Sequence, residues 1–141
     1  MSEENKALAR RFLRMFELGD PSMADEIVAV DYYNHDAPDP KIGLEGIKAA
    51  VTRFKQSLPD AQVKIAFQIA EGDKVATRYS WSGTHQGEFF GIPATGKRVN
   101  WRVTVTFRIA DGKIHESWIN YDLLDVMQQL GVSPTSGQSG S

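Results

Sequence analysis

Residues 99–121 read VNWRVTVTFRIADGKIHESWINY, and this stretch decides the fold class. Apolar and polar side chains alternate through its first half, which is typical of a strand with one buried face. The side chains predicted to face inward are those of Val99, Trp101, Val103, Val105, Phe107 and Ile109. The Ala-Asp-Gly-Lys run at 110–113 is a tight-turn sequence. We therefore expect two antiparallel strands joined by a turn.

The glycine-rich loop before this hairpin resembles a nucleotide site. Residues 91–97, GIPATGK, satisfy the G-x-x-x-x-G-K pattern of a phosphate-binding loop. Such a loop needs a Ser or Thr hydroxyl after the Lys and a helix that begins at once. Here Arg98 follows, and then a strand. The sequence therefore argues against a nucleotide site, and we expect Lys97 and Arg98 to be solvated.

Two more strands precede that loop. Their apolar alternation is carried by Val63, Ile65, Phe67 and Ile69, and then by Val75, Thr77, Tyr79 and Trp81. The run Glu-Gly-Asp-Lys at 71–74 predicts a tight turn between them. Four strands in all are expected from the sequence.

The first half of the chain has the helical period instead. A first helix should end at Gly19, and a second should begin at the cap Asp20 with Pro21 as its first residue. A third should run to Pro59, after an irregular segment at 31–43 that contains two prolines. Helices followed by an antiparallel sheet predict an α+β fold, in which the helices cover a curved sheet. A cavity between the two layers is a common place for a small ligand.

Length and composition limit the functions that this chain could have. With 141 residues, we expect one domain over residues 1–131 and a polar flexible tail over 132–141. The net charge of −2, without long charged runs, argues against nucleic acid and membrane surfaces as partners. The absence of Cys excludes thiolate chemistry. No leader or bilayer-length apolar stretch is evident, so we expect a cytoplasmic protein.

Polar residues on inward faces are the candidates for chemistry. The inward face of the second strand continues to His85, and Phe89, Phe90 and Ile92 should fold over the cavity or against a partner subunit. On the last strand, alternation places one set of side chains on the face of Ile114. This set comprises Glu116, Trp118, Asn120 and Asp122. A carboxylate in an apolar space must find a partner or have its pKa raised.

Each of these candidates also has a structural interpretation. Asp122 precedes LLDVMQQL and is a good helix cap, an interpretation that the pattern alone favours over a catalytic one. His85 is more often a loop residue bonded to backbone, Glu116 could pair with an Arg, and His35 could mark a polar bend. A metal site made by His35, Asp36 and His85 is weakly indicated, because their spacing matches no familiar site. No Ser lies in a G-x-S-x-G turn.

Three segments together resemble the SnoaL-like polyketide cyclases. They are GTHQGEFFGIPATGKRV at 83–99, DGKIHESWINYDLLDVMQQLG at 111–131 and YYNHD at 32–36, and Ala94 replaces a Pro that many relatives have. The resemblance implies a nuclear transport factor 2-like cone, in which three N-terminal helices pack on a curved, mostly antiparallel sheet around an apolar pocket. It also implies a homodimer or higher oligomer and an intramolecular aldol condensation that needs no metal and no cofactor.

The same resemblance implies roles for particular residues. Asp122 matches the family's acid/base, and His35 and His85 match histidines that line such pockets. Substrate-binding side chains are expected at Tyr33, Asn34, Tyr79, Trp81, Phe89, Trp101, Trp118 and Asn120. An Asp in water has a pKa of about 3.9 and is a poor base, so the role of Asp122 requires the apolar surroundings that the three Trp residues would supply.

The hypothesis from sequence is a cofactor-independent cyclase acting on a small apolar carbonyl compound. A hydrolase, dehydratase or isomerase on the same scaffold is the alternative within enzymes, because fold does not fix function. A non-catalytic binding module is the alternative outside them. The two classes differ in geometry. Convergence of Asp122, His35 and His85 in an open cavity favours an enzyme, and an Asp122 that points outward and caps a helix favours a binding module.

Overall fold

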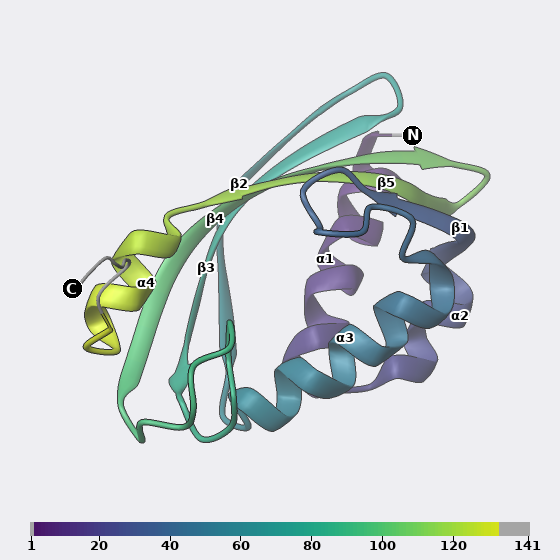
Figure 1. The fold of residues 1–141 in the computed structure, drawn as a ribbon. Helices are drawn as coiled ribbons and strands as arrows, with labels where there is room; N and C mark the ends of the chain where they lie inside the picture. The colour runs from purple at the N-terminus through teal and green to yellow at the C-terminus, as the bar shows by residue number, and fades with distance from the viewer. Residues whose placement is uncertain (1, 133–141) are drawn as a thin grey trace.

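The computed structural model describes residues 2–132, in which helices pack on the concave side of one bent sheet. The helical part contains α1 (Ser2–Leu18), the 3-10 turn η1 (Pro21–Met23), α2 (Ala24–Ile27) and α3 (Gly43–Ser57). The strands are β1 (Val28–Asn34), β2 (Gln62–Glu71), β3 (Lys74–Thr84), β4 (Arg98–Ala110) and β5 (Lys113–Tyr121), and α4 (Leu123–Gln129) follows. Figure 1 shows α1 and α3 on the concave side of the sheet and α4 beside the far end of β4.

The sheet has five strands in the order β1-β5-β4-β3-β2. β1 is parallel to β5, and all other neighbours are antiparallel. The sequence therefore predicted the α+β class and the mostly antiparallel sheet correctly, but it missed β1. Pro38 and Pro40 favour an irregular segment over 31–43, whereas β1 runs through Asn34 and buries Val28, Ala29 and Tyr32. A parallel partner distant in the sequence leaves no turn signal beside the strand.

The helix boundaries follow the local signals. Gly19 has φ +68 and ends α1, a conformation that Gly adopts readily. The Asp20 side chain accepts a hydrogen bond from the Ser22 backbone N–H and starts η1 at Pro21. The second predicted helix is shorter than expected, because Val28 already belongs to β1.

The core lies between the helices and the concave face of β3, β4 and β5. The side chains predicted to face inward from β4 are all buried there, at Val99, Trp101, Val103, Val105, Phe107 and Ile109. Phe12 of α1 packs on Phe107, with ring centroids 4.7 Å apart. Of the predicted tail, Val132 packs against this core, and residues 133–141 lie outside the described residues.

Two β-bulges change which face the later residues of β2 and β5 occupy. In β2, Ile65 pairs with Tyr79 and Phe67 with Arg78, so Ala66 is an extra residue. Beyond it, Phe67 and Ile69 are 56% and 62% exposed. The prediction that both share the inward face of Ile65 is therefore wrong, because an extra residue inverts the alternation of a strand.

Candidate functional site

A cavity of about 660 Å³ lies between α1, α3 and the concave face of the sheet. Most of its lining is aromatic or aliphatic. The apolar lining side chains are Phe12, Leu13, Phe16, Ala50, Phe54, Trp81, Phe89, Phe90, Trp101, Val103 and Ile119, and the others lining it are Arg53, Gln56, Ser57, Tyr79, Gly87, Glu88 and Tyr121. A cavity of this size and character suits a small, largely apolar molecule.

Two tyrosines bring hydroxyl groups to this apolar lining. Tyr79 on β3 pairs with Val103 on β4, which pairs in turn with Tyr121 on β5, so all three occupy one row of the sheet. Burial raises the pKa of Tyr79 well above its usual range, and burial also raises the pKa of Tyr121. Both phenols are therefore neutral near pH 7 and can donate hydrogen bonds to an oxygen atom of a ligand.

The loop between β3 and β4, the mouth loop, supplies part of the cavity lining. Phe89 and Phe90 form part of the lining, with their ring centroids 4.2 Å apart. Phe89 also approaches Trp101, with centroids 5.4 Å apart, and Phe90 stacks on Tyr121 at 5.6 Å. Of the three side chains expected to fold over the cavity or against a partner subunit, Phe89 and Phe90 thus line the cavity, and Ile92 is buried outside its lining. Lys97 and Arg98 are exposed, as predicted.

Glycine is required at one position of this mouth loop. A Cβ atom on Gly87 would lie 2.5 Å from the backbone oxygen of Gln56 at the end of α3. The loop uses this closeness, because the N–H groups of Gln86 and Gly87 both donate to the Ser57 carbonyl, at 2.9 and 3.2 Å. The Ser57 hydroxyl donates in return to the Glu88 carbonyl. The loop is therefore fixed to α3 as well as to the strands.

Four of the eight predicted substrate-binding residues line the cavity: Tyr79, Trp81, Phe89 and Trp101. Each of the other four lies elsewhere. The cavity residues that the sequence analysis missed include Phe12, Phe16 and Phe54, whose helical spacing indicated only a core. Ile119 and Tyr121 also line the cavity, whereas unbroken alternation from Ile114 would put both on the outer face of the last strand.

A β-bulge in β5 explains why Ile119 and Tyr121 face the cavity. Arg108 pairs with Glu116 and Ile109 with Ile114, so His115 is the extra residue. Beyond it, Ile119 and Tyr121 line the cavity, and Tyr121 lies in one row with Val103 and Tyr79. Both residues are therefore on the concave face. The prediction that Glu116, Trp118 and Asn120 share the inward face of Ile114 is therefore wrong, because the bulge inverts the alternation.

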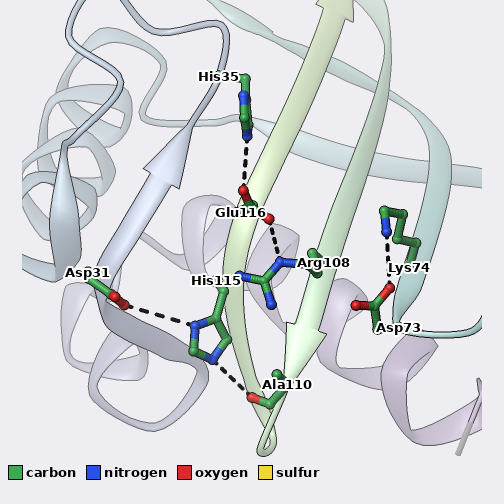
Figure 2. A network of polar contacts seen from close by, with 8 residues as sticks. All are labelled: Asp31, His35, Asp73, Lys74, Arg108, Ala110, His115 and Glu116. Carbon is green, nitrogen blue, oxygen red and sulfur yellow. Dashed lines mark hydrogen bonds and ion pairs between the residues drawn. The ribbon is translucent and has the colours of Figure 1, made fainter.

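Glu116 and His35 form a polar cluster away from the cavity lining (Figure 2). The Arg108 guanidinium and then the His35 ring, both hydrogen-bonded to the Glu116 carboxylate, hold the pKa of Glu116 below its usual range. His35 Nε2 donates to Glu116 Oε1 at 3.2 Å, and the His35 ring stacks on Trp118 with centroids 4.5 Å apart. These contacts are the Arg pairing that the sequence left open for Glu116.

The neighbours of His35 in the sequence are also outside the cavity lining. Tyr33 contacts the His35 ring, with centroids 4.6 Å apart. The Asn34 side chain accepts a hydrogen bond from the Asp36 N–H at 3.0 Å, as in a local turn. Asp36 Oδ2 accepts from the Ile119 N–H at 2.6 Å, on the side of β5 where its pairing with β1 has ended. This segment therefore has structural contacts of its own.

Asp122 caps α4. Its Oδ1 accepts a hydrogen bond from the Asp125 N–H at 3.0 Å. The residue lines a second, polar hollow of about 350 Å³ rather than the apolar cavity. That hollow is lined by Arg78, Trp101, Arg102, Thr104, Asn120, Tyr121, Asp122 and Asp125. The structure therefore has the capping geometry that the pattern favoured, and it does not bring Asp122 together with His35 and His85.

His85 is fully buried beneath the mouth loop and does not line the cavity. Its ring is hydrogen-bonded to Thr95 and to the Ile92 carbonyl. Within residues 2–132, no group of three or more Asp, Glu or His side chains is arranged to hold a metal ion. No helix in this part of the chain is long and apolar enough to cross a membrane.

Comparison with known proteins gives consistent matches over nearly the whole chain. Residues 6–130 match the sequence family described as SnoaL-like polyketide cyclase. Aklanonic acid methyl ester cyclase DnrD of Streptomyces peucetius is 32% identical over 130 residues, which cover 88% of this chain and 88% of that protein. Aklanonic acid methyl ester cyclase DauD of Streptomyces sp. (strain C5) is also 32% identical, over 88% of this chain and 80% of that protein.

Among solved structures, TsrD from Streptomyces laurentii is similar to this chain throughout. The TM-score is 0.87 at 30% identity, and the match covers 94% of this chain and 98% of TsrD. The arrangement of helices on a bent sheet is thus shared with a protein whose sequence differs at most positions.

Proposed function

Because the chain belongs to the SnoaL-like polyketide cyclase family, we propose that it closes a ring of a polyketide-derived substrate inside the cavity between α1, α3 and the sheet. The observation that carries this proposal is the aromatic cavity of about 660 Å³ with two neutral phenols in one row of its sheet wall. Such a cavity can hold a flexible chain folded with its reacting carbons close together, which supplies much of the rate of an intramolecular reaction.

The proposed chemistry is an intramolecular aldol condensation. A proton leaves a carbon next to a carbonyl, this carbon forms a bond to a second carbonyl carbon, and the oxygen of that carbonyl gains the negative charge and then a proton. Tyr79 and Tyr121 support this step, because phenols that stay neutral can donate hydrogen bonds to the oxygen on which charge develops.

Proton removal must use groups at the mouth of the cavity. Glu88 is the one carboxylate among the described lining residues, and it is exposed. The proton therefore passes to Glu88 or to solvent beside it. A polyketide carbon between two carbonyl groups is already acidic, so this step needs less help from the protein than the charge on oxygen does.

A binding function without catalysis is the second candidate, and the position of Asp122 favours it. The family resemblance implies an acid/base at Asp122, but its carboxylate caps α4 and lies outside the cavity lining. Under this alternative the cavity holds the same class of molecule, and the phenols only orient it.

Turnover of aklanonic acid methyl ester, the compound in the names of DnrD and DauD, tests the proposal. We expect conversion by the wild-type protein, and a fall in kcat of about 100-fold for Tyr121→Phe and for Tyr79→Phe, since each loses one donor to the oxyanion. Ser80→Ala is the matched control, because it removes a hydroxyl from the residue next to Tyr79 on the other face of β3. Full kcat in both Tyr variants would contradict the assignment.

The two candidates separate in the same assay. Binding of the compound without conversion, seen by calorimetry, would support the binding function over catalysis. If the protein neither binds nor converts this compound or shorter polyketide chains, the use of the cavity for this substrate class is refuted.

A further inference from the structure

We propose that His85 is a positioning residue whose neutral ring holds the mouth loop, residues 86–97, closed over the cavity. Any effect of His85 on kcat rests on the proposed function, but the protonation of the ring and the conformation of the loop do not. The ring is fully buried, yet all of its polar atoms are bonded to the loop itself. The ring therefore contacts the loop and not a ligand, and it acts on the cavity through the loop residues that line it.

The hydrogen bonds define the tautomer of His85. The Thr95 backbone N–H can only donate, and it points to His85 Nδ1 at 3.2 Å. Nδ1 must then be an acceptor without a proton, and it also accepts from the Thr95 hydroxyl at 2.9 Å. The proton resides on Nε2, which donates to the Ile92 carbonyl at 3.2 Å. One neutral ring thus joins two points of the loop.

Backbone bonds continue this attachment on both sides. The His85 N–H donates to the Lys97 carbonyl and the Gly96 N–H to the His85 carbonyl, each at 2.8 Å. The Ile92 carbonyl accepts from the Phe89 N–H at 3.0 Å as well as from His85. The ring is therefore bonded directly to the turn that presents Phe89 and Phe90 to the cavity.

That turn is strained, so it needs to be held. Phe90 has φ 53 and Gly91 has φ 75, and a bulky side chain rarely adopts a positive φ. In this conformation Phe90 stacks on Tyr121, one of the two phenols of the cavity. Release of the turn would remove this contact and open the mouth at Phe89 and Phe90.

A second proton on the ring would break the attachment. An N–H at Nδ1 of the buried ring would face the Thr95 N–H, donor against donor. The charged side chains closest along the chain or bonded to its neighbours are Glu88 and Lys97 of the loop, and Asp60, which accepts from the Thr84 N–H and pairs with Arg98. Among the described contacts none of them bonds to the ring. The attachment therefore requires the neutral ring.

Nitrogen-15 NMR of the wild-type ring tests this inference without a substrate or a mutation. We expect the signals of a neutral ring with its proton on Nε2, and slow exchange of the Thr95 and Gly96 amides, whose hydrogen bonds end on His85. A proton on Nδ1 at neutral pH, or Thr95 and Gly96 amides that exchange as fast as those of an unstructured loop, would overturn the proposal.

Two variants separate the hydrogen bond from simple packing. Asn at position 85 keeps an acceptor near the place of Nδ1, whereas Leu has similar bulk and no acceptor. In His85→Leu we expect the Thr95 and Gly96 amides to exchange at least about tenfold faster, equivalent to about 1.4 kcal/mol, and in His85→Asn much of the protection to return. His115→Asn is the control, because His115 bonds to the Ala110 carbonyl far from the loop. Equal exchange in the Leu and Asn variants would refute the role of the acceptor.

The same variants distinguish this inference from the proposed function. Binding of an apolar fluorescent probe, 8-anilinonaphthalene-1-sulfonate, reports on the mouth of the cavity in the absence of chemistry. If His85→Leu opens the loop and changes probe binding while the wild-type protein converts no polyketide, the positioning role stands and the cyclase proposal falls. If conversion is observed and His85→Leu leaves the loop and kcat unchanged, the cyclase proposal stands and the positioning role falls.

Discussion

Asp122 stands at the junction of β5 and α4, where a carboxylate can cap a helix or serve a site. The hydrogen bond from the Asp125 N–H shows the capping role directly. The sequence predicted this cap from the residue type and the helix that follows, because capping depends only on neighbours in the chain. Whether the same side chain also reached a cavity depended on the direction of β5, which no local signal fixes.

Substitutions at Asp122 separate the two roles. Asp122→Asn keeps a side-chain acceptor for the Asp125 N–H, and Asp122→Ala removes it. We expect Ala to lower the free energy of unfolding by about 0.5–2 kcal/mol, and Asn to change it little, in urea denaturation. Turnover should be nearly unchanged in the Asn variant. A folded Asn variant with kcat reduced by several orders of magnitude would show instead that Asp122 is the acid/base.

The elements of this protein are correctly predicted where their period is unbroken. β3 and β4 alternate without interruption, and their inward residues Tyr79, Trp81 and Trp101 line the cavity as expected. β2 and β5 each contain one bulge, and every face assignment beyond the bulge was inverted. A bulge is selected by the pairing of two strands, so the sequence of one strand does not reveal it.

Two adjacent residues of β5 test the face assignment. Ile119 lines the cavity, whereas Trp118 stacks on His35 away from it. We expect Ile119→Trp to fill part of the cavity and weaken binding of 8-anilinonaphthalene-1-sulfonate about tenfold or more, which fluorescence titration measures. Trp118→Phe retains an aromatic ring on the other face and should leave probe binding within about twofold. The reverse pattern would mean that β5 has no bulge at His115.

At the scale of the whole molecule, the helices and the sheet share one core that surrounds the cavity. Phe107 of β4 is fully buried and contacts Phe12 of α1, so it joins the two layers. Phe67 belongs to the same sheet but faces away from the helices and is 56% exposed. The free energy of unfolding should therefore depend strongly on Phe107 and hardly on Phe67.

Alanine at these two phenylalanines measures that difference. Phe107→Ala should lower the free energy of unfolding by about 3–5 kcal/mol, because it leaves a hole in the core. Phe67→Ala should change it by no more than about 0.5 kcal/mol, as is usual for an exposed side chain. Chemical denaturation followed by tryptophan fluorescence gives both values. Similar losses in the two variants would place Phe67 in a buried interface.

The sequence by itself determined the α+β class, the end of the first helix at Gly19, the turns, the strands that alternate and the cap at Asp122. These features depend on neighbours within a few residues of one another, which the chain displays directly. Only the tertiary structure decided that β1 joins β5, which side chains beyond the two bulges face the cavity, and that Tyr79 and Tyr121 share one row of its wall. Each of those depends on pairing between distant strands, and a single extra residue in one strand exchanges its two faces.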